Sequence, residues 1–309
     1  MLTVLLATHN GAATLPAVLD AHLRLRPPAG GHRIVVVDNA SSDDTPALLA
    51  RYSTQLPLAS IRTERRGKNV ALNIGLDHIE GDLVVLTDDD AVPAVDWLIQ
   101  LRAAADQQSA FDIFSGRIDP IWPPAAPEWI QRLVPLGATF ALTGSSIECG
   151  PVEASRVWGP NMAVRRSIFA AGHRFDEAIG PQAGQYVMGS EVEFTCRLER
   201  AGHRAWHIPS AAVGHIIRPH QVERDWIVKR AYRLGRHMFH QEAGALPPEA
   251  KLLRGAPRWK YKMLAAEWVK KVLATLRRDF DQRFLAEWEI SFLQGYLSEA
   301  ATSTRTHAS

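Results

Sequence analysis

Residues 83–90 read LVVLTDDD, a short apolar run that ends in three consecutive carboxylates. Two earlier runs, LTVLLAT at 2–8 and IVVV at 34–37, are also almost entirely apolar, as are parallel strands that are covered on both faces. Segments with the apolar spacing of helices accompany them at 14–25, 45–52 and 70–78. This alternation predicts an α/β fold with an open, mostly parallel sheet.

Polar side chains follow each of the three apolar runs. Thr8 and Asn10 follow the first run, Asp38 follows the second, and the triplet at 88–90 follows the third. Ligands of open α/β sheets bind beyond the carboxyl ends of the strands. These residues therefore form the candidate site.

The triplet at 88–90 points to a divalent cation. Three adjacent carboxylates repel each other strongly unless a cation lies among them, and Mg²⁺ and Mn²⁺ take oxygen ligands. In extended backbone, Asp88 and Asp90 would share a face. The alternative is that the triplet forms a solvated turn or a helix cap. A cap would account for one aspartate before a helix, but it accounts poorly for three.

Asp38 stands where an acid can accept hydrogen bonds from a base N–H or a ribose hydroxyl. The turn after the first run, THNGAAT at 8–14, lacks the G-x-G-x-x-G fingerprint, which argues against NAD or FAD. The chain also has no G-x-x-x-x-G-K-[ST] loop, which argues against an ATPase. A phosphate group would therefore be met by the cation and by a side chain such as Lys68.

Taken together and in order, these motifs resemble the family 2 glycosyltransferases of the GT-A fold. The resemblance covers residues 2–236, about three quarters of the chain. The similar stretches are THN at 8–10, VVDNASSDDT at 36–45, GKNVALNIGL at 67–76, DDD at 88–90, GPNMAVRR at 159–166, GSEVEFTCRL at 189–198 and GH at 214–215.

The resemblance implies that a sugar is transferred with inversion from a nucleoside diphosphate sugar, expected to be a UDP-sugar, to a glycan or lipid-linked acceptor. The donor would bind in residues 1–110 and the acceptor in residues 111–225, which together form a Rossmann-like GT-A catalytic domain. Asp38 would meet the base, Asp88 the ribose, and Asp90 a Mn²⁺ or Mg²⁺ ion at the phosphates. The other donor-binding residues that the resemblance implies are Thr8, Asn10, Lys68, Asn73, Asp89 and Asn161.

Two further site residues come from the second half of the resemblance. His215, which follows the apolar segment at 211–214, would be an additional metal or diphosphate ligand. The other histidines between 203 and 240 are interpreted as core or surface residues, with His220 as the reserve ligand.

Glu191 stands where the family usually has aspartate and is the expected general base. Ser190 replaces the usual acid next to it. Glu193 is the alternative base, and either glutamate could instead favour the helix N-terminus or pair with Arg197.

The C-terminal third differs in charge from the rest of the chain. The formal net charge of +2 is the sum of −5 over residues 1–215 (18 basic, 23 acidic) and +7 over residues 216–309 (17 basic, 10 acidic). From 258 to 297 apolar residues recur at helical spacing, which predicts a basic amphipathic extension over 226–299, followed by a disordered tail at 300–309. The extension could lie on an anionic membrane surface, or it could pack on the catalytic domain or on a second copy.

The composition, 46% apolar and 22% charged, is that of an ordinary globular protein. No membrane-spanning stretch or leader is evident, so we expect a cytoplasmic protein, or one held peripherally on the inner face of the membrane. Neither a nucleic-acid-binding signature nor a cysteine framework is present. The alternative functions are a sugar-nucleotide nucleotidyltransferase, which would usually begin with a glycine-rich loop, and a non-catalytic nucleotide-sugar-binding protein.

Overall fold

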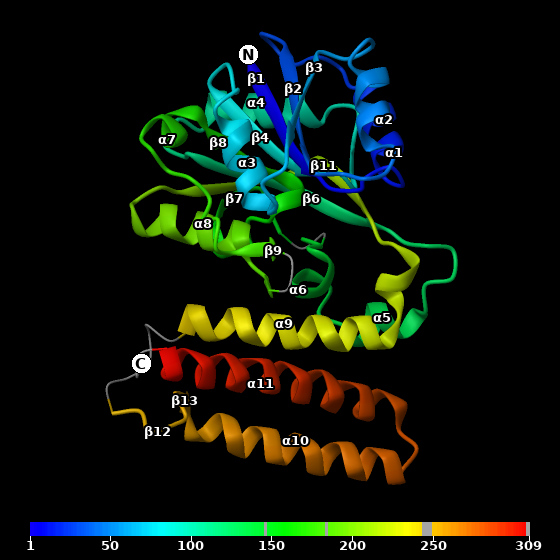
Figure 1. Ribbon diagram of the computed structural model, residues 1–309, viewed down its shortest axis with the longest axis vertical. Helices are drawn as coiled ribbons and strands as arrows, with labels where there is room; N and C mark the ends of the chain where they lie inside the picture. Colours follow the sequence, from blue (N-terminus) through cyan, green and yellow to red (C-terminus); the bar gives the residue numbers. More distant parts are fainter. Residues whose placement is uncertain (145–146, 183–184, 243–248, 307–309) are drawn as a thin grey trace. The chain divides into compact units, whose positions relative to one another are not determined.

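Among the residues that the computed structural model describes, all but 145–146, 183–184, 243–248 and 307–309, nine strands form one mixed sheet. Its order is β3-β2-β1-β4-β8-β6-β11-β5, with β7 paired to β11 (Figure 1). The sheet belongs to the first of two units, which comprises Met1–Ile121, Phe140–Gln185 and Gly189–Ile216. The predicted α/β class with a large, mostly parallel sheet is confirmed.

The N-terminal half of the sheet contains the predicted β-α-β-α-β order. Strand β1 pairs in parallel with β2 and β4, and β2 pairs in parallel with β3. Only β3 escaped prediction, because this edge strand alternates between more and less exposed residues rather than forming an apolar run. The elements are β1 (Leu2–Thr8), α1 (Leu15–Leu23), β2 (His32–Asn39), α2 (Thr45–Tyr52), β3 (Leu58–Thr63), α3 (Lys68–Leu76) and β4 (Leu83–Asp88).

In the second half, β8 lies antiparallel between β4 and β6, so the sheet is not parallel throughout. The long strand β11 runs parallel to β6 and antiparallel to β5. The strands are β5 (Ala91–Pro93), β6 (Ile113–Ile121), β7 (Gly150–Val152), β8 (Met162–Arg165), β9 (Gly180–Gln182), β10 (Gln185–Val187) and β11 (Ala205–Ile216). The helices and 3₁₀ turns are α4 (Trp97–Gln107), η1 (Ala154–Arg156), η2 (Gly159–Asn161), α7 (Arg166–Ala170) and α8 (Ser190–Arg200).

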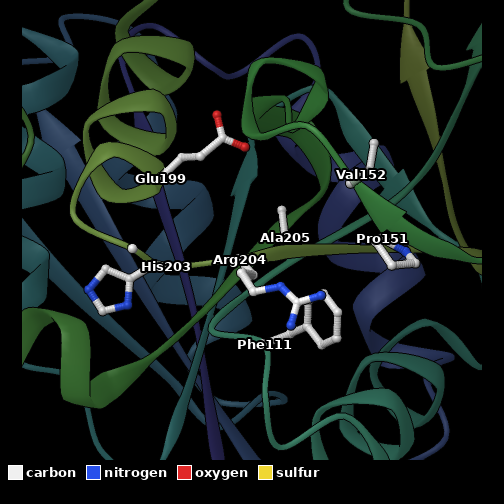
Figure 2. A pocket seen from close by; sticks show the side chains of 8 residues that line it. Phe111, Pro151, Val152, Glu199, His203, Arg204 and Ala205 are labelled. Carbon is white, nitrogen blue, oxygen red and sulfur yellow. The ribbon is translucent and has the colours of Figure 1, made fainter.

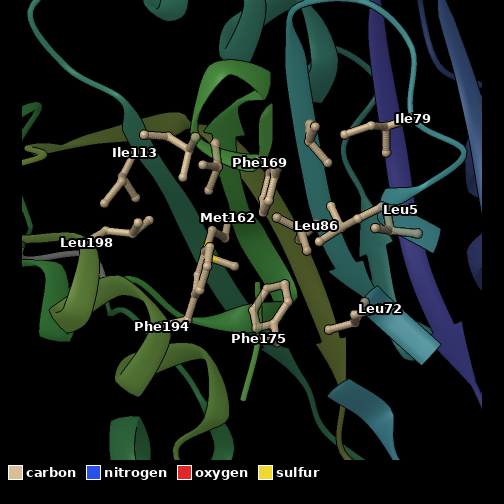
Figure 3. Close-up of a cluster of buried hydrophobic side chains, with 14 of the residues drawn as sticks. Leu5, Leu72, Ile79, Leu86, Ile113, Met162, Phe169, Phe175, Phe194 and Leu198 are labelled. Carbon is tan, nitrogen blue, oxygen red and sulfur yellow. The ribbon is translucent and has the colours of Figure 1, made fainter. Parts of the chain in front are cut away.

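One hydrophobic cluster connects the helices that carry the candidate site. Leu72 of α3 and Phe194 and Leu198 of α8 pack with the sheet residues Leu86 and Met162 (Figure 3). All five side chains are at most 2% exposed. Since burying a large side chain contributes about 1.5–3 kcal/mol, this cluster fixes the first turns of α3 and α8 relative to each other.

The second unit comprises Trp122–Thr139, Tyr186–Met188 and Ile217–Ser309. Helix α11 packs on both α9 and α10. Gly235 and Gly295 allow α9 and α11 to approach closely, because a Cβ on either glycine would lie 1.9 Å from a carbonyl oxygen of the other helix. The elements are α5 (Glu128–Leu133), α6 (Leu136–Phe140), η3 (Pro219–Val222), α9 (Arg224–Glu242), β12 (Leu252–Leu253), β13 (Ala256–Pro257), α10 (Arg258–Leu276) and α11 (Phe280–Thr306).

The C-terminal third and the division into units depart from the sequence expectation in three ways. The apolar stripe at 258–297 forms two helices, because a turn with Arg278 at φ 55° separates α10 from α11. The tail expected to be disordered from residue 300 is helical through Thr306, because Ala300 is fully buried against Phe239 and Tyr296, and residues 307–309 lie outside the described part. Residues 122–139 and 217–225, expected in the catalytic domain, group with the helical unit.

Candidate active site

The carboxyl ends of β1, β2 and β4 lie side by side because these strands pair in parallel. Thr8 stands opposite Asp38, and Asp88 stands opposite the residue before Thr8. The Thr8 hydroxyl donates a hydrogen bond to Asp89 Oδ2 at 2.6 Å. Gly11 leaves room for this contact, since a Cβ there would lie 2.2 Å from Thr8 Oγ1 and 2.8 Å from Asp89 Oδ2.

Each aspartate of the triplet has a polar partner of its own. Lys68 Nζ donates a hydrogen bond to Asp88 Oδ1 at 2.6 Å, and His215 Nε2 lies 3.2 Å from Asp90 Oδ1. Asp89 is held by the threonine hydroxyl. The Asp88 and Asp90 side chains are only 20% and 13% exposed, which argues against the alternative of a solvated turn. Protein groups thus relieve much of the repulsion that the triplet would otherwise suffer.

Lys68 also reaches the expected general base. It begins α3, and its Nζ donates a hydrogen bond to Glu191 Oε1 at 2.6 Å. Burial disfavours the ammonium, but the charges and hydrogen bonds of the two carboxylates outweigh it and hold the pKa of Lys68 well above its usual value. Burial raises the pKa of the Asp88 carboxyl. The charges of Glu191 and Asp90 also raise this pKa, and the ammonium of Lys68 opposes the increase.

Glu191 occupies the first turn of α8, where one backbone conformation and two contacts determine its position. Helix α8 begins after Gly189 in a left-handed conformation with φ 89°. The Ser190 hydroxyl donates a hydrogen bond to Asn69 Oδ1 at 2.5 Å, which ties α8 to α3. The Glu191 side chain packs directly over Gly159, where a Cβ would lie 2.7 Å from its Oε1.

Glu193 has a different environment. Arg197 Nε donates a hydrogen bond to Glu193 Oε1 at 2.8 Å, one helical turn away. The pairing considered for either glutamate is therefore made by Glu193, and Glu191 faces Lys68 instead.

His215 is positioned by β11, which places it opposite Ala91, the residue after the triplet. The Ile216 N–H donates a hydrogen bond to the Asp90 carbonyl at 2.8 Å, and His215 Nδ1 lies 2.7 Å from the Phe140 carbonyl oxygen. Burial works against the charged ring, but Asp90, then Asp88 and this carbonyl, outweigh it and raise the pKa of His215.

The other histidines with described contacts meet groups away from the triplet. His203 Nδ1 lies 2.7 Å from Asp112 Oδ2, and His207 Nδ1 lies 2.9 Å from the Ser115 hydroxyl. Burial lowers the pKa of His207 to about 4. His220, the reserve ligand, is exposed and lies against Trp226.

Asp90 and His215 fit a divalent cation that is shared with a substrate. Among the described residues, no group of three or more His, Cys, Asp or Glu side chains is arranged as a complete metal site. Mg²⁺ and Mn²⁺ commonly take one or two protein ligands and complete their coordination with phosphate oxygens and water. A carboxylate and an imidazole 3.2 Å apart at the sheet edge are such a donor set.

Asp38 and Asn10 have protein partners at the donor side. Asp38 is 2% exposed and accepts hydrogen bonds from Arg62 Nη1 at 2.9 Å and from the Ser41 N–H at 3.0 Å. The exposed Asn10 side chain accepts one from the Ser42 N–H at 2.8 Å. Arg62, which sequence reasoning missed, therefore stands beside the residue expected to meet the base.

Two residues expected to bind the donor serve the fold instead. Asn161 is fully buried, and its amide hydrogen-bonds to Trp97 and to the carbonyls of Arg117 and Ala211. Asn73 hydrogen-bonds to the backbone of Phe175. The surroundings of both side chains give no support to a donor contact, because their amides already connect segments of the protein.

Sequence reasoning also missed Asn69 and Gly159, which position Glu191. Asn69 donates hydrogen bonds to the carbonyls of Asp176 and Ile179, at 2.6 and 2.9 Å, besides accepting the one from Ser190. Both residues lie in stretches that resemble the family, at 67–76 and 159–166. The sequence does not indicate, however, which side chains an amide or a glycine at these positions contacts.

A separate cavity of about 210 Å³ lies at the start of β11 (Figure 2). It is lined by Phe111, Pro151, Val152, Glu199, Gly202, His203, Arg204 and Ala205. On the paired strand β6, the partner of His215 lies seven residues beyond the partner of Ala205, so His215 is roughly 23 Å away at the rise of an extended strand. This cavity is therefore not part of the candidate site.

Residues 3–172, more than half of the chain, match the family model described as glycosyl transferase family 2. The chain belongs to this family. The chain is 26% identical over 177 residues to the glucosyl-dolichyl phosphate glucuronosyltransferase of Haloferax volcanii, a match that covers 56% of this chain and 55% of that protein. It is 22% identical over 238 residues to glycosyltransferase AglE of the same organism, covering 76% of this chain and 71% of that protein.

The chain thus spans about half the length of the first of these relatives. Solved structures share the fold of this chain. The mannosyltransferase PcManGT of Pyrobaculum calidifontis, in complex with GDP-Man and Mn²⁺, superposes with a TM-score of 0.63 and 21% identity, covering 96% of this chain and 86% of that one. S. aureus TarS 1-349, in complex with UDP-GlcNAc, superposes with a TM-score of 0.57 and 15% identity, covering 99% and 92%.

Proposed function

We propose that this glycosyltransferase moves a sugar, with inversion, from a nucleoside diphosphate sugar to a hydroxyl of a glycan or lipid-linked acceptor, and that a divalent cation assists the transfer. The observation that carries the proposal is the position of Lys68, whose ammonium joins Asp88 on the donor side to Glu191 on the acceptor side. Lys68 thus holds a carboxylate of the donor site close to the proposed base. This arrangement suits a single displacement in which the acceptor attacks the bound donor directly.

The donor half of the proposal rests on the edge formed by β1, β2 and β4. Asp38 and Asp88 provide carboxylates for hydrogen bonds with a nucleoside. Asp90 and His215 would hold Mn²⁺ or Mg²⁺, which supplies positive charge to the leaving diphosphate when it is bound. The structural neighbours named above hold GDP-Man and UDP-GlcNAc, so guanine and uracil donors are both suitable candidates.

The chemical step assigned to Glu191 is proton acceptance. The acceptor oxygen forms a bond to the anomeric carbon, the bond from that carbon to the phosphate oxygen breaks, and the hydroxyl proton passes to a Glu191 oxygen. The nucleoside diphosphate leaves with the electron pair of the broken bond. One displacement from the opposite face inverts the anomeric carbon.

Lys68 favours the ionised form of Glu191, which this step requires. An ammonium 2.6 Å from Glu191 Oε1 favours the carboxylate, the form that can accept a proton. The other Lys68 contact holds Asp88 in place at the donor edge. The dolichyl phosphate in the name of the Haloferax glucuronosyltransferase supports a lipid-linked acceptor as the first class to test.

The test is a panel of GDP- and UDP-sugars with Mn²⁺ or Mg²⁺, in which binding is measured by calorimetry and turnover by release of the nucleoside diphosphate. We expect one donor class to bind and to be turned over, and Asp88→Asn to weaken its binding by at least about tenfold. Asp77→Asn, which changes a largely exposed carboxylate, serves as the control. If wild-type protein binds none of the sugars, or if Asp88→Asn binds them like wild type, the proposal is wrong.

A further inference from the structure

Helix α10 faces the rest of its unit with charged side chains as well as apolar ones. The residues on this side recur at spacings of four and three, and they are Lys260, Leu264, Glu267, Lys271 and Ala274. Lys260 Nζ lies 3.1 Å from Glu242 Oε2 of α9, and Lys271 Nζ lies 3.3 Å from Glu287 Oε1 of α11. Ion pairs therefore occupy the side where a surface helix usually carries its apolar stripe.

The remaining surface of α10 is apolar and exposed. Its large side chains are 41% to 76% exposed, and they are Trp259, Met263, Trp268, Val269, Val272, Leu273 and Leu276. The neighbouring helix α11 behaves in the ordinary way, because its Phe284, Leu293 and Tyr296 are fully buried. Large exposed apolar side chains on a helix whose inward side carries two ion-paired lysines mark an interaction surface.

Basic side chains bracket this apolar surface. Arg258 and Lys262 are exposed near the start of α10, Lys270 is exposed in its second half, and Arg277 and Arg278 are exposed in the turn that follows. Helix α10 contains five Lys or Arg residues and a single glutamate. The surface therefore combines exposed apolar side chains with positive charge at both ends.

We propose that α10 lies in the plane of an anionic membrane surface. Val269, Val272 and Leu276 enter the boundary between headgroups and acyl chains, while the bracketing Lys and Arg side chains contact the anionic headgroups. Tryptophan is enriched at this depth of a bilayer, which suits Trp259 and Trp268. Among the described residues no helix is both long and apolar enough to cross a membrane, so α10 would lie on the surface.

Charge distinguishes this partner from a second copy of the chain. A two-fold dimer brings a patch against itself, so Lys262, Arg277 and Arg278 would face a like-charged surface. Anionic headgroups complement the same side chains. Membrane docking is separate from the proposed transfer chemistry, because none of these residues belongs to the candidate active site.

The test is flotation of the full chain with vesicles. We expect it to float with phosphatidylcholine vesicles that contain about 30% phosphatidylglycerol at low salt, not to float with pure phosphatidylcholine, and to dissociate at about 0.5 M salt. The Val269→Ser/Leu276→Ser variant should partition at least about tenfold more weakly. Lys262→Gln/Arg277→Gln should lose about fivefold for each charge.

Val95→Ser, at a side chain that is 44% exposed in the first unit, is the matched apolar control and should float like wild type. Circular dichroism shows whether each variant is folded. Absence of flotation on anionic vesicles at low salt overturns the proposal, as does equal flotation of wild type and Val269→Ser/Leu276→Ser. A wild-type dimer that these two substitutions dissociate, together with no vesicle binding, assigns the surface to a second copy instead.

Discussion

The Nζ atom of Lys68 lies 2.6 Å from Oε1 of Glu191, although 123 positions separate the two residues in the chain. Each residue stands in the first turn of its helix, and the cluster around Phe194 fixes these helices relative to each other. The donor edge and the proposed base are thus connected through one side chain, which makes the effect of removing it predictable.

Lys68→Met should lower both turnover and stability. Two carboxylates that are about one-fifth exposed would lose the ammonium they share. We expect kcat to fall by at least about tenfold and the free energy of unfolding to fall by about 1–3 kcal/mol, as measured by steady-state kinetics and urea titration. Arg24→Met, at an exposed turn, should change neither. Wild-type turnover in Lys68→Met would show that the contact is not used.

Gly159→Ala should act on the base while leaving most of the fold intact. The new Cβ would lie 2.7 Å from Glu191 Oε1, so the side chain must move. We expect kcat to fall by about ten- to a hundredfold with unchanged donor affinity, because a displacement of about 1 Å is sufficient for such a loss. Gly31→Asn, at a glycine with open space around it, is the control. A loss of donor affinity equal to the loss of kcat would argue against this explanation.

Asp90→Asn and His215→Gln should each raise the Mn²⁺ concentration needed for half-maximal activity by at least about tenfold. Mn²⁺ binding measured by electron paramagnetic resonance, with nucleoside diphosphate present, should change in parallel. His203→Gln provides a matched control, since His203 and Asp112 form a similar pair away from the triplet. If all three variants respond alike to Mn²⁺, the cation is bound elsewhere.

Stability should fall with pH below about 6.5 because of His22. Burial lowers the pKa of His22 from 6.5 to about 3. Between these values the unfolded state binds more protons than the folded state, so the stability present above pH 6.5 is lost as the pH falls, by up to roughly 1.4 kcal/mol per unit.

Denaturant titrations between pH 7.5 and 4.5 measure this slope for wild type, His22→Phe and the control His78→Gln, whose side chain is exposed. Only His22→Phe should flatten it. Burial also lowers the pKa of His207 and of His237 to about 4, so these two residues will cause part of the pH dependence of stability in every variant. An identical slope in wild type and His22→Phe would contradict the assignment.

The first half of the fold could be predicted because its central strands are continuous apolar runs and each run ends in polar residues. The edge strand β3 could not, since it is covered on one face only. The contacts of Thr8 and Lys68 with the acidic triplet were also beyond prediction, because β1 and α3 come close to it only when the sheet forms, whereas the family resemblance had already grouped His215 with Asp90.

Two features that the sequence does not reveal share another physical cause. The sequence identifies Asn161 as polar but not its partners, and three protein groups bind its amide. Periodicity likewise identifies α10 as amphipathic but does not say which side is covered. In the structure, the ion pairs of Lys260 and Lys271 lie on the inward side, and most of the large apolar side chains of α10 are exposed.

Glu191→Gln tests the proposed mechanism most directly. With the donor identified by the panel, release of nucleoside diphosphate should fall by at least about a hundredfold, while the donor Kd stays within about twofold of wild type, because only the proton acceptor is lost. Glu193→Gln, two residues away and paired with Arg197, should keep most of the activity. Turnover of Glu191→Gln within about twofold of wild type would contradict the assignment of Glu191 as the base.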